Sequence, residues 1–233
     1  MSSYPSRGMH GAAVDGLAQQ IINGDLAPGT VLDPRELERE YDASRTVIRE
    51  ALRVLSAKGL VDARPKRGTF IRPREDWNLL DPDVLRWQYE QREDTGFLDN
   101  LAEVRAIVEP AGARLAARRR TDGDLEAMRE SLEESAAADS SGIVAADLRF
   151  HRALLFSTHN ELLQRMELVI ETGLRARDLL VHGQESWADS LPAHRRVLDA
   201  VEDGDEAAAE AAMNALLDQA NRDVAELSTG ENA

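Results

Sequence analysis

The chain has 233 residues, with 28 Lys and Arg against 43 Asp and Glu, and carries a formal net charge of −15. A net charge of this sign argues against a protein that coats nucleic acid along its whole length. The chain contains no cysteine, which excludes disulfides and thiolate-ligated zinc or iron–sulfur centres and is typical of a reducing compartment. No apolar run approaches the ~20 residues that span a bilayer, and no signal-peptide pattern is evident, so we expect a cytoplasmic protein without membrane contact.

The first 74 residues are predicted to form one small domain that begins with a flexible arm over 1–10. Asp33 and Ser44 each stand directly before a helical pattern and can cap it, which predicts helices over 34–41 and 44–58 with a tight turn between them. The second helix has one basic and one apolar face. The basic face carries Arg45, Thr46, Arg49 and Arg53, and the apolar face carries Val47, Ala51, Val54 and Leu55.

A short basic hairpin is predicted directly after this helix. Residues 60–64 and 69–72 have strand character, and Pro65-Lys66-Arg67-Gly68 forms the turn between them. The order helix, turn, basic helix, basic hairpin is typical of a winged helix-turn-helix, whose second helix enters the major groove of DNA. Residues 43–74 hold nine Lys and Arg against two Asp and Glu, whereas the residues after 74 hold 16 against 34. A solvated cationic face is the alternative, but the hairpin favours DNA binding at this one surface.

This region resembles the GntR family of bacterial transcription regulators. The resemblance rests on GDLAPGTVL (24–32), PRELEREY (34–41), SRTVIREALRVL (44–55) and KGLVDARPKRGTFI (58–71). It implies a homodimer on a double-stranded DNA operator. The implied operator contacts are Arg35, Ser44, Arg45, Thr46, Arg49, Lys66, Arg67 and Gly68. An arginine at 45 or 49 can bond bidentately to guanine, whereas Thr46 and the Gly68 N–H are suited to phosphates. We expect Arg39 and Lys58 to be solvated.

The chain beyond residue 74 is predicted to be helical almost throughout. A linker and a first bundle helix, opened by Asp81-Pro82, are expected over 75–95, and a helical domain over 96–228. No segment in this part alternates like a strand. The predicted fold is mainly α, with an N-terminal winged helix-turn-helix and small β-hairpin wing followed by an antiparallel bundle of about seven helices. The first long helix of this domain carries an apolar stripe of Phe97, Leu101, Val104, Val108, Ala111 and Leu115.

Polar residues interrupt the apolar faces of this bundle. Asp147 lies on an otherwise apolar stripe, His151 follows one helical turn later, and His194 has an inward position on a later helix. Such residues can share a divalent metal, or an Asp and a His can form a hydrogen-bonded interior pair. Arg105 flanks the first apolar stripe, where its guanidinium needs an anion. That anion is either an effector carboxylate or Glu109, one turn on.

The helical domain resembles the FCD effector-binding domain of the FadR branch of GntR regulators. The matching segments are LAEVRAIVEPAGARLAARR (101–119), DLRFHRALLFSTHNELL (147–163) and AHRRVLDAVEDGDEAAAEAAM (193–213). The resemblance implies a divalent metal (Zn, Ni or Mn) with Leu216 in place of a fourth, histidine ligand; the metal-free alternative is direct hydrogen bonding to the effector. The implied metal ligands are Asp147, His151 and His194, and the implied effector-binding residues are Arg105, Asp147, His151, Arg175 and His194. The segment WNLLDPDVLRW (77–87) also resembles regulators of sugar-acid catabolism.

These features lead to the hypothesis of a DNA-binding regulator that is not an enzyme. We expect a repressor that binds a pseudo-palindromic operator as a homodimer and is released by a small carboxylate such as a sugar acid. The alternative is a metal-dependent enzyme that uses Asp147, His151 and His194, but no general base or nucleophile can be placed beside them. A third hypothesis is a DNA-binding scaffold without a ligand.

Overall fold

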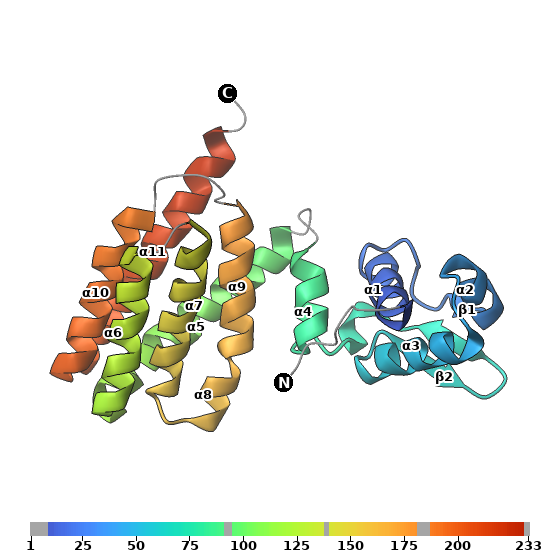
Figure 1. Ribbon diagram of the computed structural model, residues 1–233, viewed down its shortest axis with the longest axis horizontal. Coiled ribbons are helices and arrows are strands. Elements are labelled where there is room, and N and C mark those ends of the chain that lie inside the picture. The colour runs from blue at the N-terminus through green and yellow to red at the C-terminus, as the bar shows by residue number, and fades with distance from the viewer. Residues whose placement is uncertain (1–8, 91–94, 138–139, 181–186, 231–233) are drawn as a thin grey trace. The chain divides into compact units, whose positions relative to one another are not determined.

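The structure, a computed structural model, describes residues 9–90, 95–137, 140–180 and 187–230 and divides into two compact units, Met1–Asp94 and Thr95–Ala233 (Figure 1). The arm expected over 1–10 lies outside the described residues, except that Met9 and His10 begin the first helix. The first unit contains α1 (Met9–Ile22), β1 (Val31–Leu32), α2 (Pro34–Glu40), α3 (Arg45–Ala57), β2 (Val61–Arg64), β3 (Gly68–Ile71), a 3-10 turn (Arg74–Asp76) and α4 (Pro82–Tyr89).

The helix-turn-helix forms where its capping residues predict it. The Asp33 carboxylate accepts a hydrogen bond from the backbone N–H of Arg35 at 2.8 Å, and the Ser44 hydroxyl accepts one from the N–H of Val47 at 3.4 Å. These bonds satisfy donors that have no partner inside a helix. The chain reverses between the helices at Asp42, whose φ of +45° lies in the left-handed region that Asp tolerates. Helices α2 and α3 are therefore set by local sequence.

The wing is part of a three-stranded antiparallel sheet with the strand order β1-β3-β2. Strand β3 pairs with β2, where Arg64 lies opposite Gly68, and with β1, where Val31 lies opposite Phe70. The hairpin was predicted from the sequence. Strand β1 was not, because a strand of two residues is too short to show the alternation of polar and apolar side chains that identifies a strand. At the turn Gly68 has a φ of +82°, a conformation for which glycine has no steric penalty.

Helix α4 belongs to the first unit, although the sequence suggested a linker and a first bundle helix over 75–95. Helix α4 packs against α1, and Trp87 is almost fully buried in the core that α1 and α3 share. The Trp87 indole N–H donates to Asp15 at 2.8 Å, and Arg86 forms an ion pair with the same carboxylate at 2.9 Å. The compact unit therefore reaches Asp94, whereas the predicted domain ended at residue 74.

The described residues of the second unit form seven helices and no strand. The segment 161–180 is divided near Met166 into two helices. Among the described helices, none is both long enough and apolar enough to cross a membrane. The helices are α5 (Thr95–Arg119), α6 (Asp122–Ala137), α7 (Ser140–Phe156), α8 (Glu161–Arg165), α9 (Glu167–Leu180), α10 (Trp187–Asp203) and α11 (Glu206–Gly230).

Helix α5 packs against four other helices of the bundle, α7, α9, α10 and α11. Its buried face differs from the predicted stripe, because Val104 and Val108 are only partly buried while Arg105 and Glu109 point into the interior. Phe97 and Leu101 of the stripe are buried as expected. A helix surrounded by neighbours has no single apolar side, so the stripe did not reveal which face carries the polar interior residues.

Candidate functional site

The exposed face of α3 is basic, as the sequence predicted. The side chains of Arg45, Thr46, Arg49 and Arg53 are exposed. The opposite face is anchored in the core by Ile48, Ala51, Leu52 and Leu55, with Val47 and Val54 partly buried against it. Ile48 and Leu52 were not named in the predicted apolar face. Burial of one side of this short helix holds its basic side outward.

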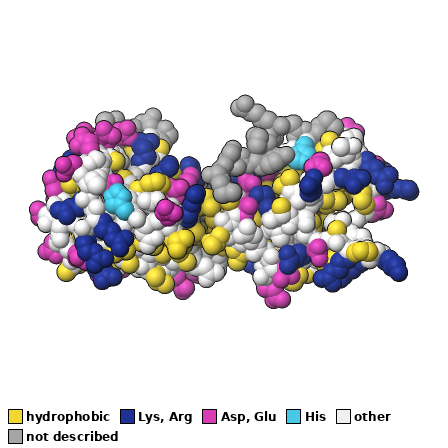
Figure 2. Space-filling view, turned by 90° about the horizontal axis from the view of Figure 1, so that it is seen from below, with side chains coloured by type: hydrophobic (Ala, Val, Ile, Leu, Met, Phe, Trp, Pro, Cys, Tyr) yellow, Lys and Arg dark blue, Asp and Glu magenta, His cyan; other side chains and the backbone are white. Residues whose placement is uncertain are grey.

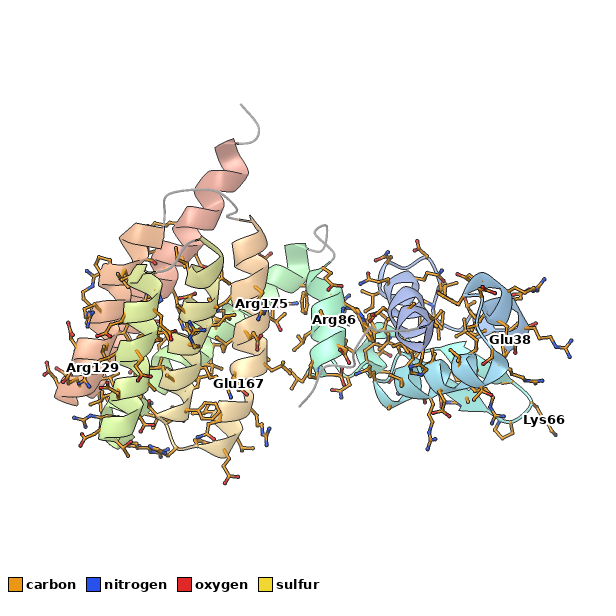
Figure 3. The ribbon with its side chains drawn as sticks, in the orientation of Figure 1. Glu38, Lys66, Arg86, Arg129, Glu167 and Arg175 are labelled. Atoms are coloured by element: carbon orange, nitrogen blue, oxygen red, sulfur yellow. The ribbon has the colours of Figure 1, made fainter. Side chains whose placement is uncertain are left out.

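The wing brings a second group of cations to the same unit. Figure 3 shows Lys66 at the tip of the hairpin formed by β2 and β3. The Arg67 guanidinium stacks on the Phe70 ring at 3.8 Å from its centroid, and Arg64 lies at 5.4 Å from the same ring. Stacking of this kind orients a guanidinium and leaves its N–H groups available to a ligand. The wing tip therefore presents an oriented arginine beside Lys66.

Most of these cations form no ion pair with a described residue. Within the described part of the chain, no ion pair involves Arg35, Arg45 or Arg49 on the two helices, or Lys66 or Arg67 on the wing. Figure 2 shows Lys and Arg side chains gathered at the end of the first unit where α2 and the hairpin lie. Although the protein has a net charge of −15, positive charge on this surface is therefore not neutralised by ion pairs among the residues that the structure describes.

Lys58 differs from these residues and from its predicted solvation. It is 9% exposed and forms ion pairs with Asp81 and Asp83, both at 2.7 Å. Burial alone would lower the pKa of Lys58, but hydrogen bonds to the two carboxylates outweigh it, so the pKa is raised. Lys58 is thus a structural tie between the end of α3 and the start of α4. It is not available to DNA.

The second unit contains a buried cluster of charged side chains from three helices. His194 on α10 and His151 on α7 direct their Nε2 atoms at Asp147 Oδ1, at 2.9 and 3.5 Å. On its other side, His151 Nδ1 contacts Glu109 of α5. Glu109 in turn accepts a hydrogen bond from Arg105 Nε at 2.6 Å. The five residues are between 0% and 7% exposed.

The charges in this cluster stabilise one another. Burial would raise the pKa of Glu109, but Arg105 and His151 lower it to about 2. Burial would raise the pKa of Asp147 as well, yet His151 and His194 hold it well below its usual range. Burial would lower the pKa of His151, but Glu109 and Asp147 raise it to about 9. At neutral pH the cluster without a ligand therefore holds ionised carboxylates balanced by Arg105 and a protonated His151.

Three members of the cluster fit a divalent metal. One ligand atom from each of Asp147, His151 and His194 lies within 4.8 Å of the other two, and all three residues are buried. Asp147 Oδ1 is buried and makes no hydrogen bond of good geometry, so its lone pairs are available to a cation. The set of one carboxylate and two imidazoles suits Zn²⁺, Ni²⁺ or Mn²⁺. Leu216 is buried in the apolar core beside Met213 and supplies no fourth ligand.

Arg175 does not join this cluster. It lies on α9 with Glu167, as Figure 3 shows, and lines a separate cavity of about 230 Å³ between α7 and α9. Arg175 forms an ion pair with Glu171 at 2.9 Å, and Arg152 forms one with Glu167 at 3.0 Å. Arg105, by contrast, reaches the cluster and pairs with Glu109, the partner that the sequence offered as the alternative to an effector. In the sequence, Glu109 could be found as a partner of Arg105 because the two residues are four positions apart and so lie on the same side of a helix.

Comparison with known proteins assigns the chain to a family. Residues 10–71 match the model for bacterial regulatory proteins of the gntR family, and residues 100–219 match the FCD domain. This chain belongs to the GntR family and carries an FCD domain. It is 37% identical to the galactonate operon transcriptional repressor of Escherichia coli (strain K12) over 216 residues, which cover 91% of this chain and 94% of the relative.

Two further likenesses agree with this family. The chain is 34% identical over 206 residues to the HTH-type transcriptional regulator LutR of Bacillus subtilis (strain 168), with 84% of this chain and 92% of LutR covered. Among solved structures, a GntR protein of Streptococcus agalactiae is similar with a TM-score of 0.52 and 27% identity, covering 91% of this chain and 99% of its own. The chain is therefore a transcriptional regulator, and the alternative of a metal-dependent enzyme has no support.

Proposed function

We propose that the protein is a homodimeric repressor that binds a pseudo-palindromic operator through α3 and the wing, and that a small hydroxylated carboxylate bound in the second unit releases it. The observation that carries the DNA-binding part is the uncompensated basic face of α3 next to an oriented wing arginine. A helix of this kind fits the major groove, and two copies related by two-fold symmetry read two half-sites.

The operator contacts divide by chemistry. Arg45 and Arg49 are exposed on α3 and can bond bidentately to a guanine edge, which supplies sequence specificity. Ser44 and Thr46 at the start of the helix, together with Arg35 on α2, are suited to phosphate oxygens. From the wing, Lys66, Arg67 and the backbone N–H of Gly68 reach the adjacent groove or backbone. Contacts to phosphate release counterions, so operator binding weakens as salt is raised.

The effector site is the buried cluster of the second unit. Asp147, His151 and His194 would hold a divalent metal, which would polarise a ligand oxygen and take the place of the His151 proton. Exchanging one proton for a divalent cation adds one positive charge to the cluster. This charge is unbalanced, because the pairs Arg105–Glu109 and His151–Asp147 are each neutral before the exchange. A single carboxylate balances it. The relative from E. coli is named for galactonate, a hydroxylated monocarboxylate of this kind.

Release follows from differential affinity. The cluster joins α5, α7 and α10, so an effector that binds there more tightly in one bundle arrangement shifts the protein toward that arrangement. Operator affinity must then fall by the factor by which DNA weakens effector binding. Arg175 in its separate cavity would contact the effector only if the bundle rearranges, so we rank it below Arg105.

The experiment that tests the DNA-binding part is a gel shift on the DNA upstream of the protein's own gene. Arg49→Ala should weaken specific binding about 5- to 150-fold, which corresponds to the ~1–3 kcal/mol of one bidentate base contact, while leaving the fold intact. Arg129→Ala is the matched control, because it removes an arginine that pairs with Glu202 at 2.6 Å in the other unit. Equal specific binding by wild type and Arg49→Ala would remove Arg49 from the interface.

The effector part is tested by adding sugar acids, with galactonate first, to the same complex. Wild type should release the DNA and gain thermal stability from the acid. Arg105→Ala should bind DNA normally and lose the response. An unchanged response would restrict Arg105 to its pair with Glu109, and no response to any acid in wild type would favour a DNA-binding scaffold without a ligand.

A further inference from the structure

Glu109 is a charged residue that the sequence offered only as a partner for Arg105, yet it is 0% exposed and lies between two other buried charged groups. Its Oε1 accepts a hydrogen bond from Arg105 Nε at 2.6 Å, and its Oε2 contacts His151 Nδ1. Removing a carboxylate from water in this way is strongly unfavourable unless the carboxylate is fully paired. A buried position of this kind therefore calls for a specific role.

The ring nitrogen that faces Glu109 determines that role. His151 presents Nδ1 to Glu109 and Nε2 to Asp147, so the two carboxylates lie on opposite sides of the imidazole. His194 has the same arrangement, with Nδ1 on the Ser190 carbonyl at 2.9 Å and Nε2 on Asp147 at 2.9 Å. In both histidines the oxygen beside Nδ1 can only accept, so it favours a proton on Nδ1, and Nε2, which faces the Asp147 carboxylate, is the nitrogen that a metal would bind in place of a proton. Both histidines thus direct Nε2 at one point beside Asp147.

Glu109 is placed to orient a ligand and not to be one. It lies on the far side of the His151 ring from the three atoms that converge, and the group that could hold a metal consists of Asp147, His151 and His194 without it. Arg105 holds its second oxygen, which fixes the carboxylate plane. Gly173 on α9 gives Arg105 the space to do so, because a Cβ there would lie 3.0 Å from Arg105 Cδ.

We propose that Glu109 is a positioning residue that holds the His151 imidazole for metal binding, and that Arg105, through Glu109, links the carboxylate effector to the metal. The inference rests on the metal site in the proposed function. A carboxylate that accepts a hydrogen bond from a metal-bound histidine fixes its orientation and raises its basicity. The orientation of His151 matters more in this chain because Leu216 supplies no ligand, so the described residues give the metal site only three protein ligands.

The test is a titration of the full-length, chelator-treated protein with Co²⁺ alone, followed by its visible absorption. Glu109→Gln keeps the shape of the side chain and should weaken Co²⁺ binding about 10- to 100-fold. Glu202→Gln is the matched control, since Glu202 also pairs with an arginine, Arg129, at 2.6 Å but lies at the surface. It should bind Co²⁺ as wild type does. Equal affinity in Glu109→Gln and wild type would overturn the proposal.

Two readouts separate positioning from a general loss of structure. In the Zn²⁺-bound, ¹⁵N-histidine-labelled protein, the Nδ1–H of His151 should give a downfield, slowly exchanging resonance that shifts upfield in Glu109→Gln. Arg105→Gln, which does not touch His151, should weaken Co²⁺ binding less, and the double variant should lose no more than Glu109→Gln alone. Additive losses would mean that the two residues act independently and would overturn the link.

The outcomes also distinguish this inference from the proposed function. If wild type binds Co²⁺ tightly and Glu109→Gln does so equally, the metal site stands and the positioning role fails. If wild type binds no Co²⁺, the metal site and the positioning role both fail, while repression measured by gel shift is unaffected. Glu109→Gln should retain operator binding, because it changes no residue of α3 or the wing.

Discussion

Lys58 offers a direct test of the finding that α4 belongs to the DNA-binding unit. We consider Lys58→Met, which keeps most of the aliphatic stem beside the Trp87 ring and removes the ammonium group. The substitution leaves Asp81 and Asp83 without their cation. Asp81 still accepts hydrogen bonds from the first N–H groups of α4, at 2.9 and 3.3 Å, and is partly exposed. Asp83, with 4% of its side chain exposed, has lost its closest partner.

The expected loss follows from these contacts. Removing one partner of a buried ion pair typically costs about 3–5 kcal/mol, because the other charge stays in the interior. The Arg86 guanidinium lies 3.6 Å from Asp83 and screens part of the charge, which places the expected loss near the lower end, at about 3 kcal/mol. For a unit of this size, each kcal/mol lowers the melting temperature by about 4–8 °C, so the expected shift is about 12–24 °C.

The measurement is urea unfolding of the full chain in a Trp187→Phe background, where the remaining fluorescence comes from Trp77 and Trp87 of the first unit. The double variant Lys58→Met/Asp83→Asn removes the unpaired charge and should recover most of the loss. A loss below about 1 kcal/mol, the range of an exposed ion pair, would refute the burial argument. So would a double variant as unstable as the single one.

Three further outcomes are expected. Ser44→Ala should destabilise the first unit by about 0.5–1 kcal/mol in urea unfolding, because its 3.4 Å cap on α3 is lost; no change would make the cap dispensable. Leu216→His should tighten Co²⁺ binding if position 216 faces the metal, and should destabilise the bundle by introducing a polar group into its core; unchanged affinity would place 216 away from the metal. In chelator-treated protein, the pKa of His151 is raised, so the stability that His151 contributes should be complete below its unfolded pKa of 6.5 and should be lost as pH rises through about 9. The pKa of Glu109 is lowered, so the stability that Glu109 contributes should be complete above its unfolded pKa of 4.5 and should be lost as pH falls toward 2. The urea midpoint should therefore be highest between these two unfolded pKa values, and a flat profile up to pH 10 would contradict the raised pKa of His151.

The DNA-binding unit could be predicted in detail because its signals are local. Asp33 and Ser44 cap helices that begin next to them, and the turn 65–68 closes strands on either side. Lys58 could not be assigned in this way. Its partners lie 23 and 25 residues further along the chain, and only the packing of α4 on α1 brings them near. From sequence, a lysine at the end of a basic helix looks like one more cation on a solvated face.

The buried cluster was predicted in part, for a related reason. Asp147 and His151 share one helix, so their spacing alone places both side chains on the same side. The inward position of His194 on a later helix was also predicted, but its place in the same site as Asp147 and His151 came from the family resemblance. The role of Glu109 was hidden because its spacing from Arg105 equals that of an ordinary surface ion pair on a helix. The burial of both residues, which changes the meaning of the pair, depends on α7, α9 and α10 covering α5.

The two units use charge in opposite ways, and this difference bears on how they work together. On α3 and the wing, cations are exposed and unopposed, so they attract a polyanion over a distance and their effect is screened by salt. In the cluster, every charge faces an opposite charge in the interior, where salt has little access. Effector binding to the cluster should therefore depend weakly on ionic strength while operator binding depends on it strongly. In the proposed scheme, salt therefore lowers the amount of bound operator without changing the effector concentration that half-saturates the free protein, so a salt series separates the proposed effector site from the operator site.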